Sequence, residues 1–178
     1  GLMTFYEQGQ AERDFEFGIR MALQAILASP KFLFRLEEAP ATRRAGQPYR
    51  LNDMDLASRL SFFLWGTVPD AELVKLAMSG GLSAPAAYEK QVRRMLAVPR
   101  SEALAARFAA QWLRLQDAEK IRPAALLFPY WVNTLTQALK RETELFFDSL
   151  VREDRSLLEF LTADYTFVNE RVARHYDI

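Results

Sequence analysis

The segment Asn52-Asp-Met-Asp-Leu-Ala-Ser-Arg-Leu-Ser-Phe-Phe-Leu-Trp65 has the pattern of an amphipathic helix. Its apolar residues recur every three or four positions and so share one helical face: Leu56, Leu60 and Phe63. Asn52 is a favourable N-cap, because its side chain accepts a hydrogen bond from a backbone N–H of the first turn. Gly66 favours an end directly after Trp65. The spacing predicts a helix over residues 52–65.

Helical periodicity continues on both sides of this segment, and no run of four or more residues alternates cleanly between apolar and polar side chains. The sequence therefore predicts an all-α fold, a single compact helical bundle of about seven to nine helices with no sheet. The expected helices cover residues 14–28, 31–37, 52–65, 69–80, 83–98, 101–116 and 131–151, with short turns at 156–161 and 169–176. Residues 14–28 are apolar around most of the helix, so we expect this helix to be the most buried.

The composition excludes several classes of function. The 178 residues are 50% apolar, and 23 basic side chains balance 23 acidic ones, so nucleic acid is not an expected partner. The absence of cysteine excludes disulfides and thiol chemistry, and with one histidine no metal site is expected. We find neither a run of about 18 apolar residues, which a membrane-spanning helix needs, nor a signal peptide. Phosphate-binding loops and nucleophile elbows are also missing from the sequence.

Glu142 is the sharpest polar anomaly in the sequence. A helical wheel places it between Leu139 and Phe146, in the apolar stripe of the helix expected at 131–151. A buried carboxylate must be paired, protonated or reachable through a cleft. Arg59, at the edge of the stripe in residues 52–65, is the partner we expect. The pair is either a structural ion pair or, as a catalytic candidate, the base of a pocket.

Three further features are candidate ligand sites. Arg100, Arg107 and Arg114 recur every seven residues and either line a groove for an anionic polymer or form a solvated basic flank. Phe128, Tyr130 and Trp131 either form a stacking platform for sugars or plug the end of the core. His175 is either a metal or haem ligand or, as is commoner for a histidine near a helix end, a capping or packing group.

The chain resembles two bacterial domains of unknown function. It is similar to domain of unknown function 1592 in the segments Tyr49–Trp65, Val68–Asp70, Gln91–Leu96, Phe108–Trp112, Arg141–Phe147 and Ala163–Tyr176, and to the end of domain of unknown function 1595 in Phe15–Glu37. The resemblance implies a helical segment over residues 1–38, a linker at 39–48 and a helical domain over 49–178 that packs with the first segment as one unit. The family usually has glycine after His175-Tyr176, whereas Asp177 stands here.

Members of this family are typically large exported proteins in which these helical segments accompany a c-type cytochrome domain. The resemblance thus implies a periplasmic or extracellular protein, with other domains of the same protein as partners and any haem c on another domain, none in this segment. We expect a noncatalytic helical scaffold or binding module, with an anionic polysaccharide as a candidate ligand. The alternative is part of an oxidoreductase acting on an extracellular polymer or sugar. A solvent-connected cleft at Glu142 favours the enzyme, and a sealed carboxylate favours the scaffold.

Overall fold

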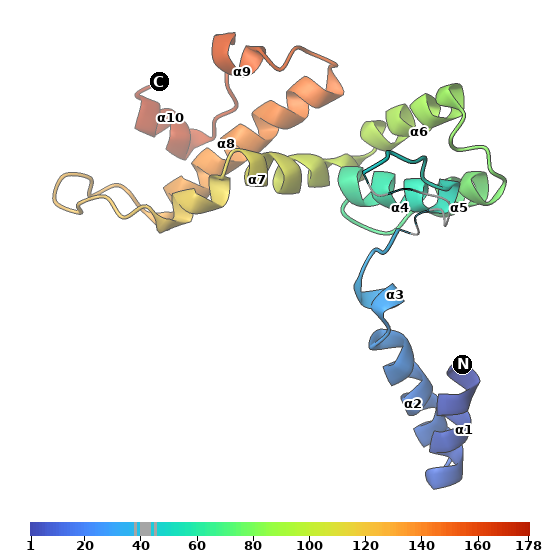
Figure 1. Ribbon diagram of the computed structural model, residues 1–178. Coiled ribbons are helices and arrows are strands. Elements are labelled where there is room, and N and C mark those ends of the chain that lie inside the picture. Colours follow the sequence, from blue (N-terminus) through green and yellow to red (C-terminus); the bar gives the residue numbers. More distant parts are fainter. Residues whose placement is uncertain (38, 40–43, 45) are drawn as a thin grey trace. The chain divides into compact units, whose positions relative to one another are not determined.

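A computed structural model describes residues 1–37, 39, 44 and 46–178 of the chain (Figure 1). Most of the linker expected at 39–48 therefore lies outside the described residues. Contacts between Cα atoms divide the chain into two compact units, residues 1–51 and 52–178. The expectation that the two units pack as one stays a prediction.

The first unit is a helical hairpin followed by a single turn of helix. Helix α1 (Leu2–Glu12) packs on α2 (Phe15–Leu27), and α3 (Pro30–Leu33) follows after the cap residue Ser29. The Asp14 side chain accepts a hydrogen bond of 2.8 Å from the Phe17 backbone N–H and so caps α2. Periodicity did not predict α1, because its apolar residues make no clean stripe, although the resemblance implied a helical segment over residues 1–38.

Two glycines allow the two helices of the hairpin to lie very close. A Cβ atom added to Gly9 would meet the Gly18 Cα at 2.9 Å, and one added to Gly18 would meet the Tyr6 carbonyl oxygen at 2.8 Å. The expectation that the helix at 14–28 is the most buried was wrong, because Gly18 is the only residue of α2 that is buried. Phe15 is 58% exposed and Leu23 53%.

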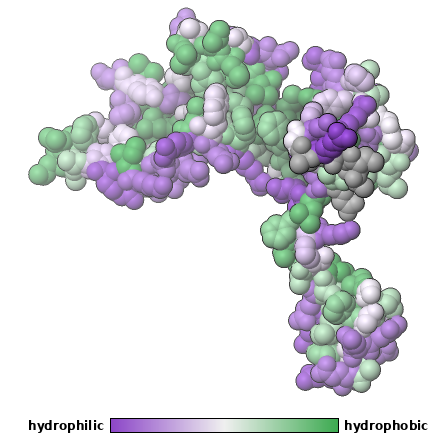
Figure 2. All heavy atoms as spheres, in the orientation of Figure 1, coloured by the Kyte–Doolittle hydropathy of each residue, from purple (hydrophilic) through white to green (hydrophobic). Residues whose placement is uncertain are grey.

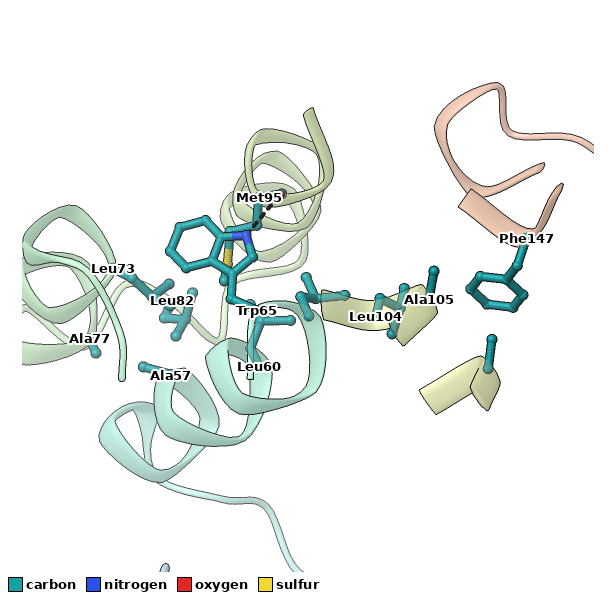
Figure 3. Packing of buried hydrophobic residues seen from close by; sticks show 12 residues of the cluster. Ala57, Leu60, Trp65, Leu73, Ala77, Leu82, Met95, Leu104, Ala105 and Phe147 are labelled. Carbon is teal, nitrogen blue, oxygen red and sulfur yellow. Dashed lines mark hydrogen bonds between the residues drawn. The ribbon is translucent and has the colours of Figure 1, made fainter. Parts of the chain in front are cut away.

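The second unit starts with three helices around a tryptophan. These are α4 (Asp53–Leu64), α5 (Ala71–Met78) and α6 (Pro85–Ala97). Asn52 caps α4 as predicted, accepting from the Asp55 N–H at 2.8 Å. The Trp65 indole lies inside this cluster, and its N–H donates to the Met95 carbonyl oxygen at 2.8 Å (Figure 3). The indole therefore joins the end of α4 to α6 with its polar atom satisfied.

The segment from Pro99 to Lys120 departs from regular α-helix. A 3₁₀ turn, η1 (Pro99–Ser101), leads into the π-helix η2 (Leu104–Ala109), and α7 (Ala110–Trp112) continues it. Arg114 then takes a left-handed conformation with φ of 56°, before the 3₁₀ helix η3 (Leu115–Lys120). The single helix expected at 101–116 is therefore replaced by three backbone geometries and ends four residues early.

Helix α8 (Asn133–Arg152) organises the rest of the second unit. The short helices α9 (Glu159–Thr162) and α10 (Glu170–Tyr176) each contact α8 (Figure 1). Val172 of α10 is buried against Leu135 and Ala138 of α8 in a small second apolar cluster. Asn169 caps α10 as expected, accepting from the Val172 N–H at 3.0 Å.

The fold class was predicted correctly. About 65% of the chain is helical, and the part that the structure describes contains no strand. The π-helical and α-helical stretch that ends at Trp112 is continuous and counts as one helix. On that count, eight helices among the described residues have seven residues or more. The prediction of about seven to nine helices agrees with this number.

Candidate functional site

Glu142 lies on α8, where two hydroxyl groups hold its carboxylate. The Thr166 hydroxyl donates to Oε1 at 2.5 Å, and the Tyr176 hydroxyl donates to Oε2 at 2.8 Å. Thr166 precedes α10, and Tyr176 is its last residue. The three side chains, here called the carboxylate clamp, tie both ends of the C-terminal helix to the middle of α8.

The carboxylate clamp changes the chemistry of the tyrosine. Burial raises the pKa of the Tyr176 phenol to about 12, and the hydrogen bond to Glu142 and the negative charge of that carboxylate act in the same direction. The phenol therefore stays neutral to a higher pH than an ordinary tyrosine, whose pKa is 10.0. It acts as a hydrogen-bond donor and not as a base.

Glu142 is only half-buried, although the sequence predicted burial inside the apolar stripe. It lines an open pocket of about 430 Å³ together with Arg141 of α8 and the extended segment of residues 166–169. Arg59, the expected partner, is exposed on α4, and the contacts described for Glu142 are those with the two hydroxyls. The hydroxyls thus occupy the place that we predicted for the guanidinium.

The predicted aromatic platform meets the single histidine. The His175 ring lies 5.8 Å from the Tyr130 ring centre and 6.1 Å from that of Trp131, and Tyr130 contacts Phe128 edge to face at 6.3 Å. Leu126 and Leu127 at the tip of the same loop are exposed, and the loop is marked by green spheres at the left edge of Figure 2. The tip of the loop is therefore an exposed apolar surface, whereas Trp131 at its end packs against the cluster of Leu135, Ala138 and Val172, as expected for a plug of the core.

A pocket of about 550 Å³ opens between this loop and α10. We call it the loop pocket, and its lining residues are Tyr130, Leu135, Glu170, Arg171, Arg174, His175 and Asp177. Arg174 donates to Glu170 at 2.5 Å, and both side chains are more than three-quarters exposed. The loop pocket thus combines an aromatic wall with charged groups that reach solvent, an arrangement that suits a polar ring.

His175 has aromatic neighbours and no cluster of ligands around it. Within the described residues, no three histidine, cysteine or carboxylate side chains come together in a way that would hold a metal ion. The ring also contacts Tyr176 at 5.6 Å, so it links the carboxylate clamp to the loop pocket. The packing role that we weighed for this histidine agrees with its surroundings.

The three arginines spaced by seven residues do not share a straight helix. Arg100 lies on η1 with its guanidinium 5.5 Å from the Trp65 ring centre, and Arg107 on η2 donates to the Gly66 carbonyl oxygen at 2.8 Å. Arg114 lies beyond α7 and forms an ion pair with Asp117 at 2.7 Å. Each guanidinium therefore has a partner inside the chain, and the binding of an anionic polymer by this triad stays a prediction.

Sequence reasoning missed Thr166 and Tyr176 as the partners of Glu142, and it missed Arg171 and Arg174. The signal for the first two was present, because both lie in segments that carry the family resemblance, as does Glu142. Such segments often lie close in space when they serve one structural element. Helical periodicity gives no such long-range pairing, since it describes each helix separately.

The fold and these sites define an all-helical domain whose C-terminal helix is fastened to a long central helix. Residues 51–178 match the family described as Protein of unknown function (DUF1592), and residues 1–37 match the one described as Protein of unknown function (DUF1595). The chain belongs to the DUF1592 family. No curated protein and no solved structure matches it. No helix among the described residues is both long and apolar enough to cross a membrane.

Proposed function

We propose that the chain is a noncatalytic helical binding module whose ligand is an acidic polysaccharide, bound at the loop pocket. The observation that carries the proposal is that Tyr130 lines one pocket together with His175 and the two arginines of α10. Two features that the sequence marked independently, the aromatic loop and the lone histidine, thereby form one concave surface.

The aromatic wall supports a sugar ligand. A pyranose ring presents C–H groups on its faces, and aromatic rings attract such groups while excluding water. Tyr130 is 53% exposed, although burying an aromatic ring of this size is worth about 1.5–3 kcal/mol. A sugar ring stacked on Tyr130 recovers part of that free energy, because it covers only the exposed face of the ring.

The charged wall supports an acidic sugar. Arg171 is exposed on the first turn of α10, and its guanidinium can bind a carboxylate through two parallel hydrogen bonds. The Arg174–Glu170 pair and Asp177 leave this wall close to neutral overall, so stacking supplies affinity and Arg171 supplies selectivity.

The carboxylate clamp supports a structural role for Glu142. Both of its oxygens accept hydroxyl hydrogens, and a general base must have an oxygen directed at the substrate. The open pocket beside Glu142 favours the second candidate function, part of an oxidoreductase with its haem on another domain. If that alternative holds, Glu142→Gln abolishes turnover by the full-length protein while unfolding stays unchanged.

The setting of the module is part of the same proposal. By resemblance, we place it in a large exported bacterial protein with a cytochrome c domain, in the periplasm or outside the cell. There it would hold a polymer close to other domains of the same protein. No nucleic acid enters this proposal, because the charges of the chain balance.

The test is retention on immobilised polygalacturonate as salt increases. Tyr130→Ala should remove retention, and Arg171→Gln should reduce both retention and its dependence on salt. Two variants serve as matched controls. Arg93→Gln removes an exposed arginine that forms an i,i+4 ion pair with Glu89, like the pair of Arg174 with Glu170, and Tyr88→Ala removes a partly exposed tyrosine of α6.

Equal retention by all four variants would refute the loop pocket as the site. Loss of retention in Arg100→Gln, Arg107→Gln or Arg114→Gln alone would move the site to the arginine triad. Retention on a neutral glucan as strong as on polygalacturonate would keep the stacking surface but reject the acidic ligand.

A further inference from the structure

The π-helix lines a third pocket, which is far more apolar than the loop pocket. This π-helix pocket has a volume of about 400 Å³ and is lined by Phe63, Leu96, Leu104, Phe108, Trp112, Phe147, Leu150, Val151, Asp154, Arg155 and Leu157. Its floor is buried core: Leu104, Phe147 and Leu150 are at most 7% exposed. Leu104 and Phe147 belong to the cluster drawn in Figure 3.

The walls of the π-helix pocket are aromatic rings left open to solvent. Phe63 is 52% exposed, Phe108 43% and Trp112 54%. Phe63 meets Phe108 edge to face at 5.5 Å, and Phe108 lies nearly parallel to Trp112, with 22° between the ring planes. Three large rings at one opening leave apolar surface in water that a ligand would cover.

The irregular backbone puts these rings in place. Phe108 and Trp112 lie on one continuous helix, and the π-helical turns of Leu104–Ala109 shift the positions of the side chains relative to an α-helix. Arg107 fixes this segment to α4, because its guanidinium donates to the Gly66 carbonyl oxygen. Segments of π-helix are rare and are frequently found at functional sites.

The rim of the π-helix pocket offers no free positive charge. The Arg155 guanidinium forms an ion pair with Glu159 at 2.7 Å and donates to the Tyr165 hydroxyl oxygen at 2.8 Å. It also lies 5.0 Å from the Tyr165 ring centre, which holds it at the rim. Asp154, beside it, is in a left-handed turn with φ of 53° and exposes a carboxylate. The rim therefore disfavours an anion and offers a hydrogen-bond acceptor.

We infer that the π-helix pocket binds a small neutral aromatic molecule, with an N–H or O–H group directed at Asp154. The size fits, because pockets for small molecules usually measure about 300–1,000 Å³ and are lined mainly by apolar and aromatic groups. The stacked pair of Phe108 and Trp112 presents ring faces and edges that attract a planar ring more than an alkyl chain. This site is separate from the loop pocket and does not depend on the proposed function.

The experiment uses N-phenyl-1-naphthylamine, a neutral diarylamine that becomes fluorescent in apolar sites, titrated into the full chain. We expect one molecule bound per chain, with binding at least tenfold weaker in Phe108→Ala and in Trp112→Leu. The leucine keeps an apolar side chain, so its effect isolates the loss of ring stacking. The anionic probe 8-anilino-1-naphthalenesulfonate should bind more weakly than the neutral one.

Two control variants separate this site from other exposed apolar surface. Leu126→Ala removes the most exposed leucine, and Tyr130→Ala removes an aromatic of the loop pocket, so both should leave the titration unchanged. Equal probe binding by Trp112→Leu and the unmodified chain would overturn the inference. The inference would also be overturned if probe binding fell as the chain dimerised at higher concentration, because a second copy of the chain would then cover the rings.

Discussion

The α1–α2 hairpin and the domain of residues 52–178 are both helical, yet they differ in which residues are buried. In the hairpin only Gly9 and Gly18 are buried, whereas the domain buries Leu73, Leu82 and Met95 completely. The hairpin is joined by close approach of two backbones, and the domain by side chains that fill a core. An apolar stripe therefore predicts that a segment is helical. It does not predict that the stripe is buried, because burial requires another element to pack against it.

The largest difference should appear when leucine is truncated in each region. Leu73→Ala removes a fully buried side chain and should cost about 2–5 kcal/mol in the free energy of unfolding. Leu23→Ala, on the exposed face of α2, should cost less than about 0.5 kcal/mol.

Urea unfolding followed by far-ultraviolet circular dichroism measures this contrast, because the hairpin and the domain are both helical. Tryptophan fluorescence would follow the domain alone, since Trp65, Trp112 and Trp131 all lie there. Leu73→Ala should lower the urea midpoint, and Leu23→Ala should leave it in place. Equal shifts in the two variants would mean that the face of α2 is covered in solution, and the comparison would fail.

A smaller effect is expected when a methyl group is placed between the hairpin helices. In an open helix, Gly9→Ala gains roughly 1 kcal/mol of helix propensity. Here the new Cβ would lie 2.9 Å from the Gly18 Cα, so the helices must separate. We expect a net loss of roughly 1–3 kcal/mol.

Hydrogen exchange of the backbone amides in residues 2–27 measures this loss as faster exchange. Gln8→Ala, one position earlier on an exposed site of α1, is the control and should slow exchange or leave it unchanged. Faster exchange in the control than in Gly9→Ala would show that the glycine contact does not hold the hairpin.

The carboxylate clamp contributes less, because it stabilises the domain through polar contacts at a partly exposed position. Tyr176→Phe should cost about 0.5–1 kcal/mol at neutral pH, the range for one net hydrogen bond. Folding favours the neutral phenol, whose pKa is raised from 10.0 to about 12. Its contribution is therefore complete below pH 10 and is lost as the pH rises toward 12.

Ultraviolet titration of tyrosinate tests the raised pKa. An ionisation step should appear near pH 12, and Tyr176→Phe should remove it. A double-mutant cycle with Glu142→Gln should show coupling between the two residues. Additive losses would separate Glu142 from Tyr176 and restore Arg59 as a candidate partner.

Local rules predicted the parts of the fold that local chemistry controls. Asn52 and Asn169 cap their helices as expected, because a cap involves only the next three residues. The π-helix at Leu104–Ala109 was missed, because its geometry depends on how Phe108 packs against Phe63 and Phe147. Intrinsic propensity contains no information about such tertiary contacts.

The same limit applies to the candidate site, where local spacing predicted the unusual residue but not its distant partners. The helical wheel found Glu142 as an anomaly, because its neighbours on the stripe are local. Its partners lie 24 and 34 residues away in the sequence, in segments whose path the wheel cannot predict. Likewise, the sequence did not predict the contact between Tyr130 and His175, because that contact forms only when the loop folds back on α10.

The last predicted effect is a small gain in stability, and it concerns Asp177, which ends α10. By the resemblance, glycine usually stands at this position, and Asp177 takes the left-handed conformation that glycine favours. Asp177 has φ of 61°, and its N–H and that of Ile178 both donate to the Ala173 carbonyl oxygen. This is the left-handed cap that glycine usually forms.

Two features of Asp177 lower the stability of this helix end. Its Cβ atom is strained in the left-handed region, and its negative charge lies at the negative end of the helix dipole. Asp177→Asn removes the charge alone, whereas Asp177→Gly removes both. In urea unfolding followed by tryptophan fluorescence, the glycine variant should be more stable by roughly 0.5–1 kcal/mol and the asparagine variant by less. Loss of stability in Asp177→Gly would mean that the aspartate side chain makes a contact worth more than the strain. The C-terminal helix would then, like the hairpin, depend on a contact that its apolar pattern does not predict.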